Sequence, residues 1–319
     1  MKILLTGQTG QIGGELTLHL QGLGEVVYFP RTGMDLSDLN QVREVIRRVQ
    51  PDLIVNPAAY TVVPKAESEP ALAMMINGEA PDVMAEEAQR LGAAMIQYST
   101  DFVFDGTQSK PYDEMAPTNP LNVYGQTKLA GEQAVAKHCE AHWILRTSWV
   151  YNAHGGNFMK NIVRLAQEQA ELTVVADQFG APTWSRTVSR TTREMLNHYR
   201  GNAAHAVAHI RATSGIYHMT ANGEASWHEY ASFIVDHLCA RGVPTKISGS
   251  AAIKPIPAPP TLPRRPQSSR LSLDKLETTF KLRMPNWRAD AIKCLDEIID
   301  NSGLIPSADD KSGTSREKP

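Results

Sequence analysis

The chain has 319 residues, 42% of them hydrophobic, and a formal net charge of −2 at pH 7. This length allows roughly two domains with substantial cores, and the nearly neutral charge gives no electrostatic reason to expect nucleic acid or an anionic membrane as partner. The cysteines Cys139, Cys239 and Cys294 are scattered without metal-ligand spacing, and there is neither a charged leader with an apolar core nor a membrane-spanning apolar run. We therefore expect a cytoplasmic protein without a disulfide framework or a zinc site.

A glycine-rich turn stands between the first predicted strand and the first predicted helix. Met1–Leu5 is a short apolar run, and Thr6–Gly13 follows it directly. In this context Gly7 would allow a tight turn, Gly10 the close approach of a pyrophosphate to backbone N–H groups, and Gly13 the packing of helix on strand. Glycines also mark ordinary loops, but the order strand, loop, helix predicts a dinucleotide site.

Strand-length apolar runs alternate with helical segments as far as residue 150. Strands are predicted at Val26–Phe29, Leu53–Asn56, Ala94–Tyr98 and Trp143–Arg146, and helices at Leu39–Val49 (capped by Ser37 or Asp38), Ala71–Ile76, Ala80–Leu91 and around Tyr124–Lys128. The alternation predicts an α/β fold, a Rossmann-type doubly wound parallel sheet with ligands at the carboxyl ends of its strands.

The pattern loosens in the second half of the chain. Helices are expected at Asn157–Glu168 and Trp227–Leu238, strands at Leu172–Val175 and Ile216–Met219, a loop at Gln178–Thr183, and an extended or turning segment at the prolines of 255–266. We divide the chain into a dinucleotide-binding domain (1–150), a smaller, mainly substrate-binding domain with possible returns to the main sheet (151–300), and a polar tail expected to be disordered (301–319).

Four residues carry the predicted chemistry. Tyr124 and Lys128 share one helical face, where an ammonium would favour the ionised phenol and tune a proton donor towards neutral pH. Alone, such a pair is usually a surface tyrosine with a solvated lysine, but the dinucleotide loop favours catalysis. Thr100 and Asp101 follow the end of a predicted strand, which puts a hydroxyl and a carboxylate at the mouth of the cleft. A Ser-Thr-Asp sequence is also common in turns and helix caps.

This arrangement resembles the extended short-chain dehydrogenases/reductases, whose catalytic group is a Ser or Thr, a Tyr and a Lys. Within that superfamily, the chain from Met1 to about Trp287 closely resembles the dTDP-4-dehydrorhamnose reductase family. The resemblance rests on T-G-Q-T-G-Q-I-G from Thr6, A-E-S-E-P from Ala66, Y-S-T-D from Tyr98, P-L-N-V-Y-G-Q-T-K-L-A-G-E from Pro120, R-T-S-W-V-Y from Arg146, D-Q-F-G-A-P-T from Asp177 and S-R-L from Ser269.

The resemblance implies an NADPH-dependent oxidoreductase that reduces the C4 keto group of dTDP-4-dehydro-β-L-rhamnose to dTDP-β-L-rhamnose. Hydride would pass from the nicotinamide to C4 while Tyr124 protonates the alkoxide at O4. Lys128 would lower the Tyr124 pKa and hold the nicotinamide ribose, and Thr100 would orient the sugar carbonyl. The alternatives are another nucleotide-sugar 4-ketoreductase or epimerase of this fold, or a non-catalytic NADP-binding regulatory subunit. The intact Thr100, Tyr124 and Lys128 set argues against a pure binder.

The resemblance also implies the binding residues. For the substrate they are Thr100, Asp101 and Trp149 at the sugar and Asn157, Gln178 and Arg270 at the diphosphate. Trp149 could instead be a core aromatic, and Arg270 a surface arginine. For the cofactor they are Gly7, Gly10, Gln11, Ile12, Gly13, Arg31, Asp35, Leu36, Ala59, Tyr60, Thr61, Tyr98, Tyr124 and Lys128.

Three positions bear on the choice of cofactor and on a metal. Arg31 follows the second predicted strand where an acid would accept from a ribose 2′-OH, so we expect NADPH to be preferred with NADH still usable, unless Arg31 faces solvent. Glu15 fits a glutamate that some family members use to hold magnesium between subunits, but Arg186 stands where a second carboxylate would help. We predict no metal; a magnesium requirement and the choice between monomer and homodimer stay open.

Overall fold

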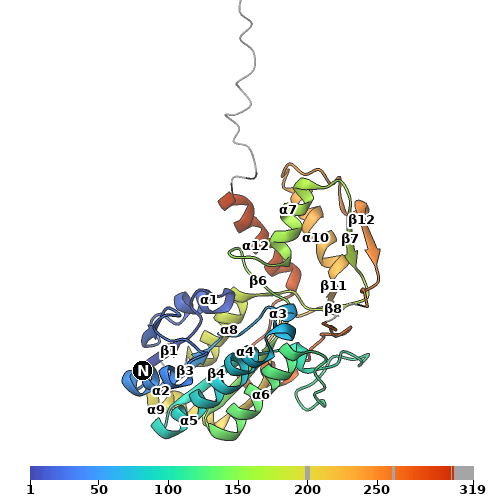
Figure 1. Cartoon of the computed structure of the whole chain (residues 1–319). Coiled ribbons are helices and arrows are strands. Elements are labelled where there is room, and N and C mark those ends of the chain that lie inside the picture. The colour runs from blue at the N-terminus through green and yellow to red at the C-terminus, as the bar shows by residue number, and fades with distance from the viewer. Residues whose placement is uncertain (198–201, 261–262, 303, 305–319) are drawn as a thin grey trace, which may run out of the picture.

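A six-stranded parallel sheet forms the centre of the computed structural model, which describes residues 1–197, 202–260, 263–302 and 304 (Figure 1). The sheet order is β10-β5-β4-β3-β1-β2, and every neighbouring pair is parallel. Its strands are β1 (Lys2–Leu5), β2 (Glu25–Tyr28), β3 (Leu53–Asn56), β4 (Ala94–Thr100), β5 (His142–Thr147) and β10 (Gly215–His218). The chain moves to one side of β1 for β2 and to the other side for β3, which confirms the predicted doubly wound fold.

Helices cover both faces of this sheet. One face carries α1 (Gln11–His19), α8 (Ser185–Leu196), α9 (Ala203–Ala212) and α11 (Asp274–Phe280), and the other carries α2 (Leu39–Val49), α5 (Ala80–Leu91) and α6 (Val123–His138). Between β3 and α5 lie α3 (Val63–Ser68), α4 (Pro70–Met74) and the π-helical turn η1 (Met75–Glu79), and the 3₁₀ turn η2 (Asp101–Val103) follows β4. Each face therefore buries its own apolar cluster against the continuous apolar strands.

A further apolar cluster lies in the second half of the chain, beyond the sheet in Figure 1. It is built from α7 (Phe158–Glu168), α10 (Trp227–Ala240), α12 (Trp287–Ser302) and the strand pair β7 (Leu172–Val175) and β12 (Ile253–Ile256), with η4 (Ser250–Ala252) beside them. Two short ladders connect it to the sheet: β6 (Val150–Tyr151) with β9 (Thr183–Trp184), and β8 (Phe179–Gly180) with β11 (Ala225–Ser226).

The chain passes between these two parts several times. The expected return to the main sheet is confirmed by β10, which pairs with β5, and α8 and α9 cover a sheet face as well. The division into 1–150 and 151–300 stays a prediction about domains, since segments of the second half belong to the core of the first. No helix within the described ranges is long and apolar enough to cross a membrane.

Three local predictions need correction. The predicted loop Gln178–Thr183 contains β8 and the start of β9, because its backbone pairs with distant segments. The sequence analysis did not predict the helices α3, α8, α9, α11 and α12. The tail predicted to start at residue 301 is still helical at Asn301 and Ser302, since Ile298 and Ile299 bury the last turns of α12 in the second-half cluster. Apart from Leu304, which packs against that cluster, the rest of the predicted tail lies outside the described residues.

Candidate active site

A cleft of about 1100 Å³ opens at the carboxyl ends of β1, β3, β4 and β5. Its lining includes the glycine-rich turn and Arg31 as well as Asn157, Gln178 and Trp227. Thr100, Tyr124 and Lys128 lie in its wall as well. The cleft is thus the place where a doubly wound sheet binds its ligands, beside the point where the strand order reverses.

The glycine-rich turn has the backbone that a dinucleotide loop requires. Gly7 has a φ of +60°, a conformation that other residues adopt with strain. A Cβ on Gly13 would lie 1.9 Å from the carbonyl oxygen of Gly7, so a side chain there would push the helix off the loop. Gly10 is the N-cap of α1 and has no side chain over the first N–H groups of that helix. These N–H groups face a cleft where a pyrophosphate would find donors and a favourable dipole.

Local packing brings Tyr124 to Thr100. Asn122 caps α6, its Oδ1 accepting from the N–H of Gly125 at 2.8 Å. A Cβ on Gly125 would lie 2.2 Å from the carbonyl oxygen of Phe102, so α6 can pack closely on the turn that follows β4. The Tyr124 ring meets Phe102 edge to face at 5.6 Å, and its hydroxyl hydrogen-bonds to that of Thr100.

The pKa of Tyr124 shifts opposite to the sequence-based prediction. Burial among protein atoms raises it to about 12, the Thr100 hydrogen bond lowers it in part, and the nearby Asp101 carboxylate raises it further. The Lys128 Nζ donates to the carbonyl oxygen of Tyr98 at 2.6 Å. Tyr124 is therefore a protonated phenol at neutral pH, the form that donates a proton.

Lys128 is buried beside an ion pair. Burial lowers its pKa to about 8, and the negative charge of Glu132, one turn along α6, limits the fall. Glu132 is held by Arg146 of β5, whose Nε and a terminal nitrogen donate to the two carboxylate oxygens at 2.9 and 2.6 Å. Both side chains of this pair are 2% exposed. A charged Glu132 therefore supports a charged Lys128 in a site shielded from water.

Asp101 is a buried carboxyl bound by two hydroxyls. Thr100 Oγ1 donates to Oδ1 at 3.1 Å, and Ser269 Oγ donates to Oδ2. Burial raises the pKa of Asp101 to about 6, although these hydrogen bonds and the charge of Arg265 lower it in part. The group thus changes charge near neutral pH, within reach of the candidate proton donor.

This shift predicts a pH-dependent stability. In the unfolded chain Asp101 titrates near its ordinary pKa of about 4, so between that pH and about 6 the folded chain binds the proton more tightly. The stability contributed by this group is full below pH about 4 and is lost as pH rises through about 6. A thermal-shift series measures the melting temperatures of wild type and of Asp101→Asn. We expect the difference, wild type minus variant, to fall as the pH rises from about 4 to about 6. A difference that grows with pH would contradict the assignment.

The predicted substrate residues separate into two groups. Trp149, Asn157 and Gln178 line the cleft, and Trp149 is only partly buried, so it is not a core aromatic. Arg270 is not among the lining residues. Its guanidinium donates to Ser268 Oγ at 3.0 Å and to the carbonyl oxygen of Ser109 at 2.9 Å, and it faces Glu224. Arg270 therefore does not line the cleft, and its role at the diphosphate stays a prediction.

The predicted cofactor residues line the cleft with one exception. The lining includes Gly7, Gly10, Gln11, Ile12, Gly13, Arg31, Asp35, Leu36, Ala59, Thr61 and Tyr98. The Tyr98 hydroxyl points away from the cleft and hydrogen-bonds to Thr192 Oγ1 at 2.6 Å. The Tyr98 carbonyl oxygen accepts a hydrogen bond from Lys128 Nζ. Tyr60 does not line the cleft, since its hydroxyl donates to Glu69 at 2.6 Å. Side chains alternate in this extended segment, so those of Ala59 and Thr61 line the cleft and that of Tyr60 does not.

Sequence reasoning missed Trp227, Arg265 and Ser269, which also line the cleft. Ser269 stood in the motif from which only its charged neighbour Arg270 was selected. Successive side chains of an extended segment point in opposite directions, a signal that could have warned against selecting by charge alone. Arg265 lies among the prolines of 255–266, and no local pattern marks it.

The residues around Glu15 do not fit a magnesium ion. Glu15 is 4% exposed, and Arg186 donates to its two oxygens at 3.1 and 3.2 Å. The same guanidinium donates to Glu297 at 2.7 Å and lies over the ring of Trp184. A guanidinium therefore already bridges the two carboxylates within the chain, at the position that a metal ion would need.

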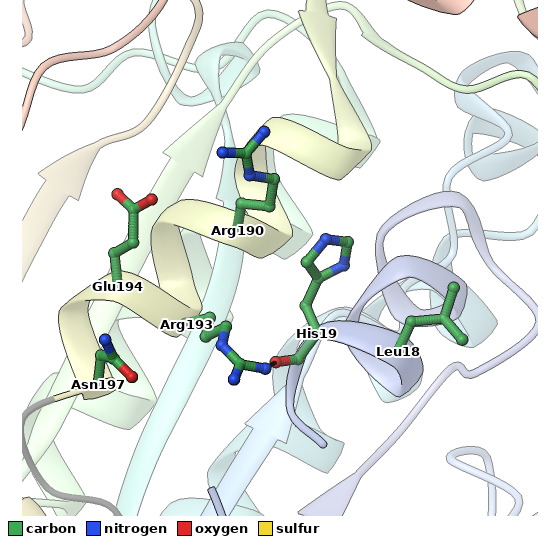
Figure 2. A pocket seen from close by; sticks show the side chains of 6 residues that line it. All are labelled: Leu18, His19, Arg190, Arg193, Glu194 and Asn197. Carbon is green, nitrogen blue, oxygen red and sulfur yellow. Dashed lines mark hydrogen bonds between the residues drawn. The ribbon is translucent and has the colours of Figure 1, made fainter. Parts of the chain in front are cut away.

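A second, smaller cavity of about 360 Å³ lies between α1 and α8. Figure 2 shows Arg190 and Arg193 of α8 beside His19 of α1, with Arg193 donating to the His19 carbonyl oxygen. None of the predicted catalytic or binding residues lines it.

Known proteins match this chain along almost its whole length. The family model described as the RmlD substrate binding domain matches residues 1–299. A dTDP-4-dehydrorhamnose reductase of Burkholderia thailandensis is 44% identical over 303 residues, covering 94% of this chain and 99% of that protein. The enzyme of the same name from Escherichia coli K12 is 40% identical over 308 residues, covering 95% and 100%.

The solved structures that resemble this chain include a dTDP-4-dehydrorhamnose reductase. The crystal structure of dTDP-4-dehydrorhamnose reductase from Bacillus anthracis in complex with NADP has a TM-score of 0.80 and 31% identity, covering 93% of this chain and 98% of that one. A UDP-glucose 4-epimerase from Thermus thermophilus with NAD has a TM-score of 0.73 at 19% identity, covering 93% and 99%, and shares the fold. By sequence match, fold and the cleft at its strand ends, the chain belongs to the dTDP-4-dehydrorhamnose reductase family.

Proposed function

We propose that this chain catalyses the NADPH-dependent reduction of the C4 keto group of dTDP-4-dehydro-β-L-rhamnose, giving dTDP-β-L-rhamnose. The observation that carries the proposal is the placement of Thr100, Tyr124 and Lys128 in one cleft with the glycine-rich turn. The relatives that match along almost the whole chain carry the name of this activity. Cytoplasmic location, a monomer or homodimer, and use of NADH remain predictions.

Tyr124, Thr100 and Lys128 have different tasks in this reaction. The bound nicotinamide supplies a hydride to C4, and Tyr124 donates its proton to the oxygen that becomes the alkoxide. The raised Tyr124 pKa keeps this proton in place until charge develops on the substrate. Thr100 holds the phenol in position and offers a hydroxyl near the same oxygen. Lys128, charged and fixed on the Tyr98 carbonyl, is placed to bind the nicotinamide ribose.

Turnover of the nucleotide sugar tests the proposal. NADPH oxidation is measured with enzymatically made dTDP-4-dehydro-L-rhamnose, and the sugar product is identified. We expect the free 4-keto-6-deoxyhexose to be a very poor substrate, because binding energy from the distant dTDP group supports positioning at C4. Comparable kcat/KM for the free sugar and the dTDP-sugar would refute the assignment. A product with another configuration at C4 or C5 would identify a related reductase or epimerase.

Arg31 is the residue expected to select NADPH. Its side chain lines the cleft, is 74% exposed and pairs with Asp35 at 3.4 Å. Such an exposed pair is weak and opens readily for a 2′-phosphate. We expect Arg31→Ala to raise KM for NADPH and to leave NADH kinetics almost unchanged. Steady-state kinetics with both cofactors measures this, and an equal effect on both, or a wild-type preference for NADH, would exclude the role.

A further inference from the structure

Two indole rings stack face to face in the wall of the cleft, and they come from distant parts of the chain. The ring centroids of Trp149 and Trp227 are 3.5 Å apart, and their planes differ by 6°. Trp149 follows β5 of the main sheet, and Trp227 is the first residue of α10. Both rings are partly exposed and line the cleft. In this arrangement each indole covers one apolar face of the other.

The Trp149 indole has a second close neighbour, Gly180. A Cβ at Gly180 would lie 2.5 Å from Cε2 and 2.7 Å from Nε1 of Trp149, nearer than real Cβ contacts allow. The φ of Gly180 is not positive, so this glycine supplies space for the ring rather than a special backbone conformation. The indole therefore occupies a slot formed by Trp227 and Gly180.

One ladder builds both sides of this slot. Gly180 of β8 is paired with Ala225 of β11, and β11 leads directly into Trp227. The hydroxyl of Ser226 accepts from the N–H of Glu229 at 3.0 Å and so fixes the start of α10. Phe158 of α7 packs on Trp227 with a centroid distance of 4.5 Å. The slot thus belongs to rigid elements and does not depend on a free loop.

The backbone of Trp149 is held in an unusual conformation. Its φ is +48°, in the left-handed region that bulky residues seldom adopt. Its carbonyl oxygen accepts from the N–H of Thr183 at 3.2 Å, at the β6–β9 ladder. Such a conformation persists only where the surroundings fix it, and residues of this kind concentrate at ligand-binding sites.

We infer that Trp227 and Gly180 are positioning residues that hold the Trp149 indole in one orientation for the nucleotide sugar. The identity of this ligand rests on the proposed function, whereas the slot itself rests on the geometry above. A fixed ring presents its apolar face to the sugar without losing rotamer freedom on binding, so affinity depends on the slot.

The indole resonances test the slot without any substrate. The chain has five tryptophans, and Trp→Phe variants assign their Nε1–H signals in a ¹H–¹⁵N spectrum. A proton held over an aromatic face shifts upfield, so we expect an upfield Trp149 signal that moves towards the random-coil position in Trp227→Leu. Gly180→Ala should move it as well, because the new Cβ displaces the ring. Gly156→Ala, where a Cβ meets nothing within 4 Å, is the matched control and should leave it in place.

Kinetics then tests the role. Trp227→Leu and Gly180→Ala should each raise KM for the dTDP-sugar about tenfold, the equivalent of one lost stacking contact, with a smaller change in kcat. KM for NADPH should not change, and Trp227→Phe, which keeps an aromatic face, should restore most of the affinity. A purely structural role would lower the active fraction and the melting temperature and leave KM unchanged.

Two results would overturn the inference: a Trp149 signal that does not move in Trp227→Leu, or sugar KM values within about twofold of wild type in both variants. The spectra need no turnover. A wild-type protein without reductase activity would therefore refute the proposed function while the Trp149 signal still decides whether the slot exists.

Discussion

Replacing Tyr124 with phenylalanine is expected to lower kcat by about 10²–10⁴-fold, the usual contribution of a positioned general acid. The hydroxyl is lost while the ring and its edge contact with Phe102 remain. NADPH affinity and the melting temperature should therefore stay close to the wild-type values. Stopped-flow turnover and fluorescence titration of NADPH measure the two effects.

A matched control separates chemistry from structure. Tyr217 of β10 is buried, and its hydroxyl donates to the Thr213 carbonyl oxygen at 2.6 Å, before the strand begins and thus at the opposite end of the sheet. Tyr217→Phe should lose some stability and keep kcat. If Tyr124→Phe also kept a near wild-type kcat, Tyr124 would have no part in proton transfer.

Removal of Glu132 alone should destabilise the protein by about 3–5 kcal/mol, the cost of leaving one charge of a buried pair uncompensated. The Arg146 guanidinium would then face the Phe104 ring, 5.0 Å from its centroid, without a carboxylate. Urea unfolding of Glu132→Gln measures this loss. The pKa of Lys128 should fall further in the same variant, because the negative charge that supports its ammonium is gone.

The double variant Glu132→Leu/Arg146→Met provides the control for charge. It removes both buried charges and replaces them with apolar groups of similar length, so most of the lost stability should return. Lys128 should still have a lowered pKa, which would appear as weaker NADPH binding at alkaline pH. A double variant as unstable as Glu132→Gln would show that shape, rather than charge, makes this pair important.

The features that the sequence predicted well are those encoded by residues close together in the sequence. The glycine-rich turn, the alternation of strands and helices, and the four-residue spacing of Tyr124 and Lys128 each depend on a few consecutive residues. Even the bounds Leu39–Val49 and Ala80–Leu91 agree with α2 and α5. Asp38, one of two candidate caps, is the residue whose carboxylate accepts from the first N–H groups of α2.

The errors have a common physical origin in contacts between distant segments. The sign of the Tyr124 pKa shift depends on burial and on where the Lys128 ammonium points, and neither follows from helical spacing. The direction of an extended segment decides that Ser269 faces the cleft and Arg270 does not.

By itself the sequence determined the fold class, the glycine-rich turn and the helical spacing of Tyr124 and Lys128, because local propensity and short motifs encode them. Only the tertiary structure decided which side chains line the cleft and how they are held. The Trp149 slot joins segments near residues 149, 180 and 227, and the buried pair joins α6 to β5. Such contacts form when the sheet and the second-half cluster pack together, and the free energy of that packing fixes side-chain orientations that no local pattern carries.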